Sequence, residues 1–230
     1  MIEEAIKNFK KGKPVLIYDY EDREGETDIA IPALHVKPRD VAMMRIDGGG
    51  LICVAVSYEA AEKLGLPFMH EVLEEASRKF KSLRGFVNHQ IPYDSRSSFS
   101  LWVNHVETYT GVTDLDRSLT IRKVGEAVEK ALNGENFDFS REFRSPGHVA
   151  VLKAAKNLVR ERKGQTELSI ALAKLAGITP AVAICEMLDE ETGRALPKEK
   201  AMEYAEENGI PFVEGREIEN YLKELNLALK

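Results

Sequence analysis

Carboxylates are concentrated in one short stretch of the chain, between Asp19 and Asp28, where six of ten residues are acidic. Six closely spaced negative charges repel one another, and a hard divalent cation with oxygen ligands would offset that repulsion. If the chain is extended over residues 24–28, alternate side chains project to one side, which groups Glu24 and Glu26 with Asp28. A solvated acidic loop is the alternative interpretation of the same charges.

A second charged stretch, residues 160–167, contains three cations and a glycine ahead of Thr166. A threonine at this position can cap a helix that begins at Leu168. The free amides of a helix N-terminus attract anions, so Arg162 and Lys163 beside such a terminus predict a phosphate pocket. The alternative is that these residues only mark the start of a helix and bind no anion.

Two further residues are candidates for proton transfer. His148 follows a proline and a glycine at the start of a predicted apolar helix over 147–161, and an imidazole pKa of about 6.5 suits proton transfer near neutrality. Glu186 follows the apolar run 181–185, whose burial would raise the carboxyl pKa and suit it to acid or base catalysis. A structural histidine and a surface carboxylate are the alternatives.

The hydrophobic pattern predicts the elements that position these residues. Apolar residues at helical spacing predict helices, and short apolar runs between breakers predict strands. The expected helices cover 2–9, 38–44, 72–83, 118–132, 147–161, 166–176, a segment from Pro197 and the tail. The expected strands cover 15–18, 29–34, 51–56, 99–103, 181–187 and 211–213. Because strands and helices are interleaved without a regular βαβ series, we expect one α+β domain over 1–230 with a mixed sheet flanked by helices.

Composition restricts the classes of function. Hydrophobic residues make up 43% of the 230 residues, which is enough for a sizeable core, and the net charge of −6 argues against a nucleic-acid partner. No apolar run approaches the roughly 20 residues that span a membrane, so we expect a soluble, cytoplasmic protein with no membrane contact. Cys53 and Cys185 lack CxxC partners, which argues against a disulfide framework or a thiolate zinc site.

Six segments, taken in order, resemble the 3,4-dihydroxy-2-butanone 4-phosphate synthase family, and its archaeal stand-alone members most closely. They span about residues 15–190. The segments are Asp22-Arg23-Glu24-Gly25-Glu26-Thr27-Asp28, Gly49-Gly50-Leu51-Ile52-Cys53, Thr110-Gly111-Val112-Thr113 with Asp116-Arg117, Arg144-Ser145-Pro146-Gly147-His148, Gly164 with Thr166-Glu167, and Ile184-Cys185-Glu186.

The resemblance implies the α/β sandwich fold of this family, a homodimer with active sites near the subunit interface, and two Mg²⁺ or Mn²⁺ ions. It also implies a lyase of riboflavin biosynthesis that rearranges ribulose 5-phosphate to 3,4-dihydroxy-2-butanone 4-phosphate and releases C4 as formate. Enolising a ketose needs a base, a proton return and stabilisation of the developing enediolate, which carboxylates, an imidazole and a divalent cation would supply.

Carried over residue by residue, the resemblance implies a role for each charged segment. Glu24 resembles the metal-binding carboxylate. The residues expected to be catalytic are acidic groups and one imidazole: Glu26, Asp28, His148 and Glu186. The residues expected to contact substrate come from both charged segments and from beside them: Arg23, Glu24, Asp28, Cys53, Arg162, Lys163, Gly164, Gln165, Thr166 and Glu186.

The chain departs from the family pattern at Gln165, which stands where the family has a histidine that resembles a metal ligand. An amide cannot offer an imidazole nitrogen, but its oxygen is an acceptable ligand for Mg²⁺. Gln165 ligates the metal through oxygen, or water fills that position, or the metal chemistry is lost. The leading prediction is an active synthase with Glu24 and Gln165 as metal ligands. A non-catalytic sugar-phosphate-binding protein and a phosphosugar isomerase are the alternatives.

Overall fold

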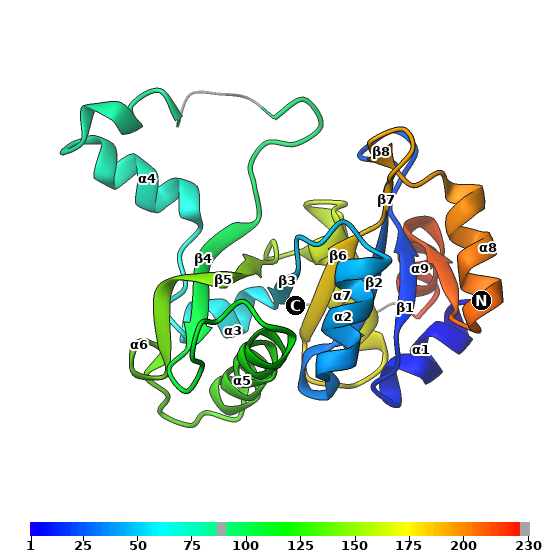
Figure 1. Cartoon of the computed structure of the whole chain (residues 1–230), viewed down its shortest axis with the longest axis horizontal. Coiled ribbons are helices and arrows are strands. Elements are labelled where there is room, and N and C mark those ends of the chain that lie inside the picture. Colours follow the sequence, from blue (N-terminus) through cyan, green and yellow to red (C-terminus); the bar gives the residue numbers. More distant parts are fainter. Residues whose placement is uncertain (87–90, 226–230) are drawn as a thin grey trace.

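The computed structural model describes residues 1–86 and 91–225 and contains one seven-stranded mixed sheet, with the strand order β4-β5-β3-β6-β2-β1-β9 (Figure 1). Its strands are β1 Val15–Tyr18, β2 Thr27–Pro32, β3 Cys53–Val56, β4 Phe99–His105, β5 Phe143–Lys153, β6 Ala181–Glu186 and β9 Phe212–Glu214. The β1–β9 and β3–β5 pairs are parallel, and the other neighbours are antiparallel. A two-stranded ribbon, β7 Leu188–Asp189 with β8 Arg194–Ala195, follows β6.

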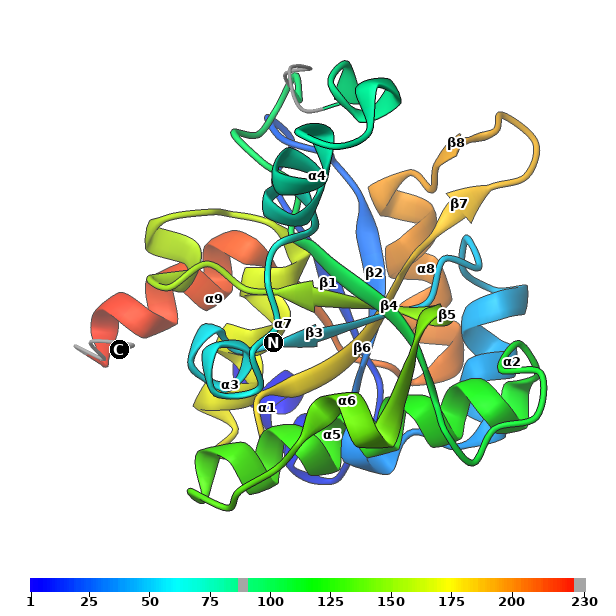
Figure 2. The same cartoon turned by 90° about the vertical axis from the view of Figure 1, so that its left-hand side faces the viewer.

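Helices cover both faces of the sheet (Figures 1 and 2). Buried residues of α2, α3, α5 and α8 share one apolar cluster with one face of the strands, and those of α1, α7 and α9 share a second cluster with the other face. The α-helices are α1 Ile2–Lys10, α2 Pro38–Ile46, α3 Tyr58–Lys63, α4 Met69–Ser77, α5 Asp114–Leu132, α6 Phe139–Glu142, α7 Gln165–Leu175, α8 Lys198–Asn208 and α9 Gly215–Glu224. The predicted α+β class, a mixed sheet flanked by helices, is confirmed.

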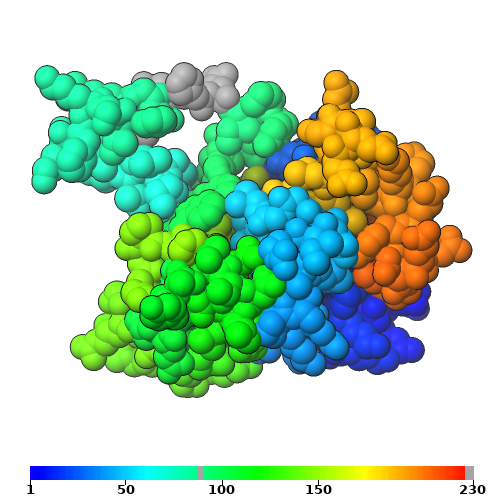
Figure 3. Space-filling view, in the orientation of Figure 1, coloured from blue at the N-terminus to red at the C-terminus, as the bar shows by residue number. Residues whose placement is uncertain are grey.

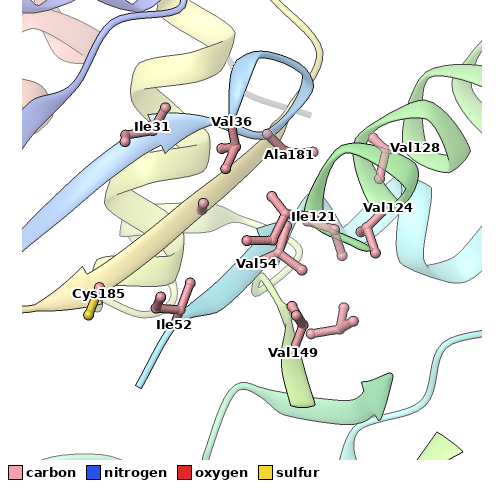
Figure 4. Close-up of a cluster of buried hydrophobic side chains, with 14 of the residues drawn as sticks. Ile31, Val36, Ile52, Val54, Ile121, Val124, Val128, Val149, Ala181 and Cys185 are labelled. Carbon is pink, nitrogen blue, oxygen red and sulfur yellow. The ribbon is translucent and has the colours of Figure 1, made fainter. Parts of the chain in front are cut away.

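Strands β1, β2, β3 and β6 are buried along almost their whole lengths because helices cover both faces of this part of the sheet. In β1, Leu16 and Tyr18 enter the cluster beneath α2 and α5, while Val15 and Ile17 enter the cluster beneath α1 and α7. Figure 4 shows side chains of β3, β5 and β6 against Ile121 and its neighbours on α5. Burial of each large aliphatic side chain contributes about 2 kcal/mol to folding. The two apolar clusters therefore stabilise the sheet, and the sheet carries the polar segments at its edge and at the ends of its strands.

The helix predicted over 147–161 is wrong, because residues 143–153 form strand β5. The error has a physical cause: the uninterrupted apolar run after His148 is a pattern that a buried strand and a buried helix share. Gly147 shows why a strand is the outcome. A Cβ on Gly147 would lie 2.0 Å from the backbone carbon of Val103, so the glycine permits close approach to β4.

Several predicted boundaries also shift. The helix α7 begins at Gln165 with Gly164 as its N-cap, so the predicted capping role of Thr166 is wrong. The helix expected over 72–83 is the shorter α4, followed by a separate 3₁₀ turn at 81–83. Figure 3 shows α4 and residues 78–86 beside, rather than within, the body of the protein. Within residues 1–86 and 91–225, every helix is too short or too polar to cross a membrane.

Candidate active site

A cavity of about 250 Å³ lies where the acidic segment, the end of β6 and the start of α7 meet. Glu24, Glu26 and Asp28 line it, as the alternate spacing of these residues predicts. Glu186 lies on the same wall because β2 pairs with β6, with Asp28 directly opposite Glu186 in the strand register. The fold therefore brings carboxylates that are distant in the chain to one cavity.

Close packing of these carboxylates changes their acidity. Burial, together with the charges of Glu24 and Glu186, raises the pKa of Glu26 to about 7. Burial raises the pKa of Glu186, and the charge of Glu24 adds to that effect. The pKa of Asp28 is well above its usual value, first because the residue is buried and then because Glu186 lies beside it. Near neutral pH this wall therefore contains carboxyl groups that can hold a proton and carboxylates that can accept one.

Asp19 shapes the acidic segment, although the sequence indicated no role for it. Its side chain is buried and accepts hydrogen bonds from the backbone amides of Glu24 (3.2 Å) and Glu26 (3.0 Å). Gly25 between them has φ +65°, a conformation that favours glycine. This turn directs Glu24 and Glu26 toward the same cavity. The position of Asp19, immediately after a buried strand, was the available signal.

The basic side of the cavity is already paired with carboxylates. Arg162 lines the cavity and donates to Asp94 (Nε, 2.6 Å) and to the buried Glu167 (Nη1, 2.6 Å). Arg23 donates to Asp94 (2.8 Å) and to Glu24 (2.6 Å). Of these two arginines predicted to contact substrate, Arg162 lines the cavity and Arg23 lines a neighbouring depression, and the shared aspartate joins them.

The remaining members of the predicted basic segment have different positions. Thr166 lines the cavity, and Gly164 permits the pose of Arg162, because a Cβ there would lie 2.1 Å from the Arg162 Nη1. Lys163 points elsewhere: it pairs with Glu219 (3.1 Å) and lies outside this cavity, among residues that line a neighbouring depression. Its predicted contact with substrate is not supported by this geometry.

Gln165 is oriented by two backbone carbonyls. Its Nε2 donates to the carbonyl oxygens of Ile17 (3.1 Å) and Glu26 (3.0 Å), which fixes the amide so that Oε1 is the remaining polar atom. That oxygen is buried and has no hydrogen-bond partner among the described residues, and Gln165 lines the cavity. A buried acceptor without a donor is costly, so Oε1 is suited to a cationic ligand.

The donors on this wall fit a hard divalent cation. Within the described ranges, no group of three or more His, Cys, Asp or Glu side chains is arranged to hold a metal ion. Mg²⁺ needs fewer protein ligands, because water and substrate oxygens complete its coordination. The carboxylates of Glu24 and Glu26 and the amide oxygen of Gln165 offer oxygen atoms only, which suits Mg²⁺ or Mn²⁺.

The structure places one predicted site residue, Cys53, in the cavity and another, His148, outside it. Cys53 lines the cavity, and burial raises its thiol pKa well above the usual value, so the side chain is a neutral thiol. His148 is exposed on β5 outside the cavity, where its backbone amide donates to Asn104 Oδ1 (2.8 Å). Within a single copy of the chain, His148 therefore does not reach the carboxylates that line the cavity.

The stretch before β4 supplies wall residues that the sequence did not single out. Tyr93 and Asp94 both line the cavity, and the Arg23 guanidinium lies 5.2 Å from the centre of the Tyr93 ring. Their only sequence signal is a polar run, with an aromatic residue, ahead of an alternating strand. Such a run is also typical of an ordinary loop, and for that reason it did not stand out.

Comparison with known proteins extends these observations. The model of the 3,4-dihydroxy-2-butanone 4-phosphate synthase family matches residues 3–221. The enzyme of that name from Archaeoglobus fulgidus is 68% identical over 223 residues, which is 96% of this chain and 94% of the relative. The one from Methanosarcina acetivorans is 55% identical over 219 residues, with 94% and 89% covered. A crystal structure of a 3,4-dihydroxy-2-butanone 4-phosphate synthase in complex with two magnesium ions superposes with a TM-score of 0.76 at 25% identity, over 99% of both chains. This chain belongs to the 3,4-dihydroxy-2-butanone 4-phosphate synthase family.

Proposed function

We propose that this chain is a 3,4-dihydroxy-2-butanone 4-phosphate synthase, a lyase that converts ribulose 5-phosphate to 3,4-dihydroxy-2-butanone 4-phosphate and formate for riboflavin biosynthesis. Relatives of that name match it over almost their whole lengths. The observation that carries the proposal is that a single cavity joins Glu24 and Glu186 to Arg162 and the start of α7. This arrangement suits a substrate with hydroxyl and carbonyl oxygens at one end and a phosphate at the other.

Carboxyl groups carry the proton transfers in this proposal. Glu26, with a pKa of about 7, is divided between its acid and base forms at neutral pH, and the raised pKa of Glu186 makes its carboxylate a stronger base. One carboxylate removes a proton from the carbon beside the ketone, and a neighbouring carboxylic acid returns a proton to the rearranged skeleton. Asp28, whose pKa is well above its usual value, is a proton donor to the developing oxyanion.

Divalent metal binding is a further part of the proposal. The structural neighbour in complex with two magnesium ions supports two divalent cations for this chain as well, which we propose are Mg²⁺ or Mn²⁺. Glu24 and the Oε1 atom of Gln165 would hold a metal ion, because both offer hard oxygen ligands to the cavity. A bound divalent cation supplies Lewis-acid stabilisation of the negative charge that develops on adjacent sugar oxygens.

The phosphate end is assigned to the residues around the start of α7. The first amides of a helix are free to bind an anion, and the Arg162 guanidinium and the Thr166 hydroxyl flank them at the cavity wall. The Arg23 guanidinium approaches from the acidic segment. Anchoring the phosphate here would place the reacting carbons near Glu26 and Glu186.

A homodimer with a composite site accounts for His148. The imidazole is exposed outside the cavity, and apolar side chains are exposed on the loop before α5, on α5 and on α2, including Tyr109 (94%), Leu115 (69%) and Ile46 (69%). A second copy of the chain covering this surface would remove apolar area from water and bring His148 toward the partner's carboxylates.

We further infer one domain over residues 1–230 and action in the cytoplasm on small molecules, without nucleic-acid or membrane partners.

Formate release tests the proposal directly. The purified protein is incubated with ribulose 5-phosphate and Mg²⁺, and products are followed by NMR. Formate is expected from the wild type and not from Glu186→Gln, which retains the fold but not the base. Thermal stabilisation by ribulose 5-phosphate without formate would favour the non-catalytic alternative. A pentose phosphate without formate would favour the isomerase.

A further inference from the structure

The carboxylate of Asp94 lies between two guanidinium groups, that of Arg162 at the cavity wall and that of Arg23 in the neighbouring depression. A single oxygen, Oδ2, accepts from Arg23 Nη2 at 2.8 Å and from Arg162 Nε at 2.6 Å. The side chains of Asp94, Arg23 and Arg162 are only 7%, 8% and 14% exposed. Burial would raise the pKa of Asp94, but the two arginines outweigh it and lower that pKa, so the carboxylate is ionised.

Other carboxylates also pair with these arginines, so the positive charge of both guanidinium groups is already balanced. Arg23 Nη1 also pairs with Glu24 (2.6 Å) and Asp19 (3.3 Å), and Arg162 Nη1 pairs with Glu167 (2.6 Å). Four carboxylates thus share two guanidiniums. Adding a phosphate dianion to this group without removing a carboxylate would place like charges side by side. A phosphate can therefore join the two arginines only by exchange.

Asp94 is the carboxylate best suited to exchange. Asp19 is held by the amides of Glu24 and Glu26, and Glu167 is buried in α7 and accepts from the amide of Ala155 (2.8 Å). The other oxygen of Asp94 accepts from the amide of its neighbour Ser95 (2.8 Å), within its own turn. The residues on both sides, Tyr93 and Ser95, are exposed.

We propose that Asp94 is a positioning residue that acts as an internal anion: it holds Arg23 and Arg162 in place and yields to the phosphate of the incoming sugar phosphate. Carboxylate and phosphate oxygens accept the same paired N–H donors of arginine, so the guanidiniums keep their positions during the exchange. The inference rests on the proposed function, because the proposed substrate supplies the phosphate.

This exchange would make the site selective for phosphorylated sugars. A sugar that lacks a phosphate carries no charge that can replace Asp94, so the arginines stay paired with the carboxylate. A phosphate ester offers more negative charge and more acceptor oxygens than the carboxylate that it displaces. Selectivity then comes from the cost of breaking the Asp94 contacts, which only a strong anion offsets.

Binding of inorganic phosphate to Asp94→Asn tests the proposal without any turnover. Calorimetry should show phosphate bound about tenfold more tightly by the variant than by the wild type, because a neutral amide competes less well for the arginines. Asp138→Asn is the matched control, since Asp138 also pairs with an arginine (Arg141, 3.1 Å) but lies away from the cavity. Its phosphate affinity should equal that of the wild type. Unchanged or weaker phosphate binding by Asp94→Asn would overturn the proposal.

A measurement on the wild type serves if the variant does not fold. During phosphate titration, the side-chain Nε–H signal of Arg162 in NMR should shift as its partner changes from carboxylate to phosphate. A signal that stays fixed while phosphate binds would also overturn the proposal. Neither measurement depends on formate release, so a chain that binds phosphate by exchange but makes no formate would contradict the proposed function and leave this inference standing.

Discussion

At the scale of single residues, the side-chain amide of Gln165 connects three parts of the site. Its nitrogen ties the end of β1, through Ile17, to the acidic segment, through Glu26, and its oxygen is left toward the cavity. The residue is therefore both a strut between two backbone segments and a potential ligand. These two roles can be measured separately, because the contact between the backbone segments uses only the nitrogen and metal binding would use only the oxygen.

We expect Gln165→Leu to weaken Mg²⁺ binding and to destabilise the fold. Loss of Oε1 should reduce affinity for Mg²⁺ about tenfold or more, and loss of the two hydrogen bonds that Nε2 donates should cost about 1–3 kcal/mol in the free energy of unfolding. Calorimetry and urea unfolding measure the two effects. Ser169→Ala, a buried change on the same helix away from the cavity, should leave Mg²⁺ affinity intact. Equal affinity in Gln165→Leu would mean that Oε1 is not a ligand.

Glu26 gives a pH dependence whose sign follows from its raised pKa. The carboxyl has a pKa of about 7 in the folded protein, against 4.5 as its usual value. Folding therefore takes up a proton between these values, and the contribution of Glu26 to stability is lost as pH rises from about 5 to 7. After allowance for solvent screening, we expect a loss of about 1–2 kcal/mol. Urea unfolding of the wild type and Glu26→Gln should show a shallower fall in the variant. Identical slopes would refute the assignment.

The sequence identified individual carboxylates better than their partners. Alternate spacing was enough to group Glu24, Glu26 and Asp28, because the period of an extended chain is set locally. The contacts of Asp94 with Arg23 and Arg162 span 71 and 68 residues, and no local pattern reports such a pairing. The amide orientation of Gln165 likewise depends on carbonyls far away in the sequence.

At the scale of elements, the sequence predicted most strands correctly but predicted a helix where β5 lies. The strands predicted at 15–18 and 181–187, observed at 15–18 and 181–186, were identified because breakers and acidic residues bound their apolar runs. The run after His148 has no such boundary on its C-terminal side, and only tertiary packing decides between helix and strand. Pairing with β3 on one edge and β4 on the other holds this segment in the strand conformation.

The close approach of β5 to β4 predicts that Gly147→Ala is destabilising. The added methyl would meet the backbone of Val103 at 2.0 Å, and backbone cannot rotate away as a side chain can. We expect a loss of about 2 kcal/mol or more in the free energy of unfolding, measured by urea denaturation. Gly85→Ala is the control, because no described atom lies within 4 Å of the place its added methyl would take, and its effect should be small. A neutral Gly147→Ala would indicate that the two strands separate readily.

At the scale of the whole molecule, the site exists because the sheet order brings distant segments together. β6 lies between β2 and β3, so Glu186 lies opposite Asp28 on β2, and Ile184, two residues before it, lies opposite Cys53 on β3. The helix α7 covers the same region and adds Gln165 and Thr166. The sequence could predict that these segments carry chemistry, but not the order of strands that unites them, since strand pairing is a property of the assembled fold.

The most direct test of the account is the fate of C4 in ribulose 5-phosphate. Substrate labelled with ¹³C at C4 is incubated with the wild-type protein and Mg²⁺, and the products are observed by ¹³C NMR. The account predicts that the label appears in formate, and that Glu186→Gln, folded as judged by its urea unfolding curve, yields none. Label retained in a five-carbon phosphate, or equal formate release by Glu186→Gln, would contradict it.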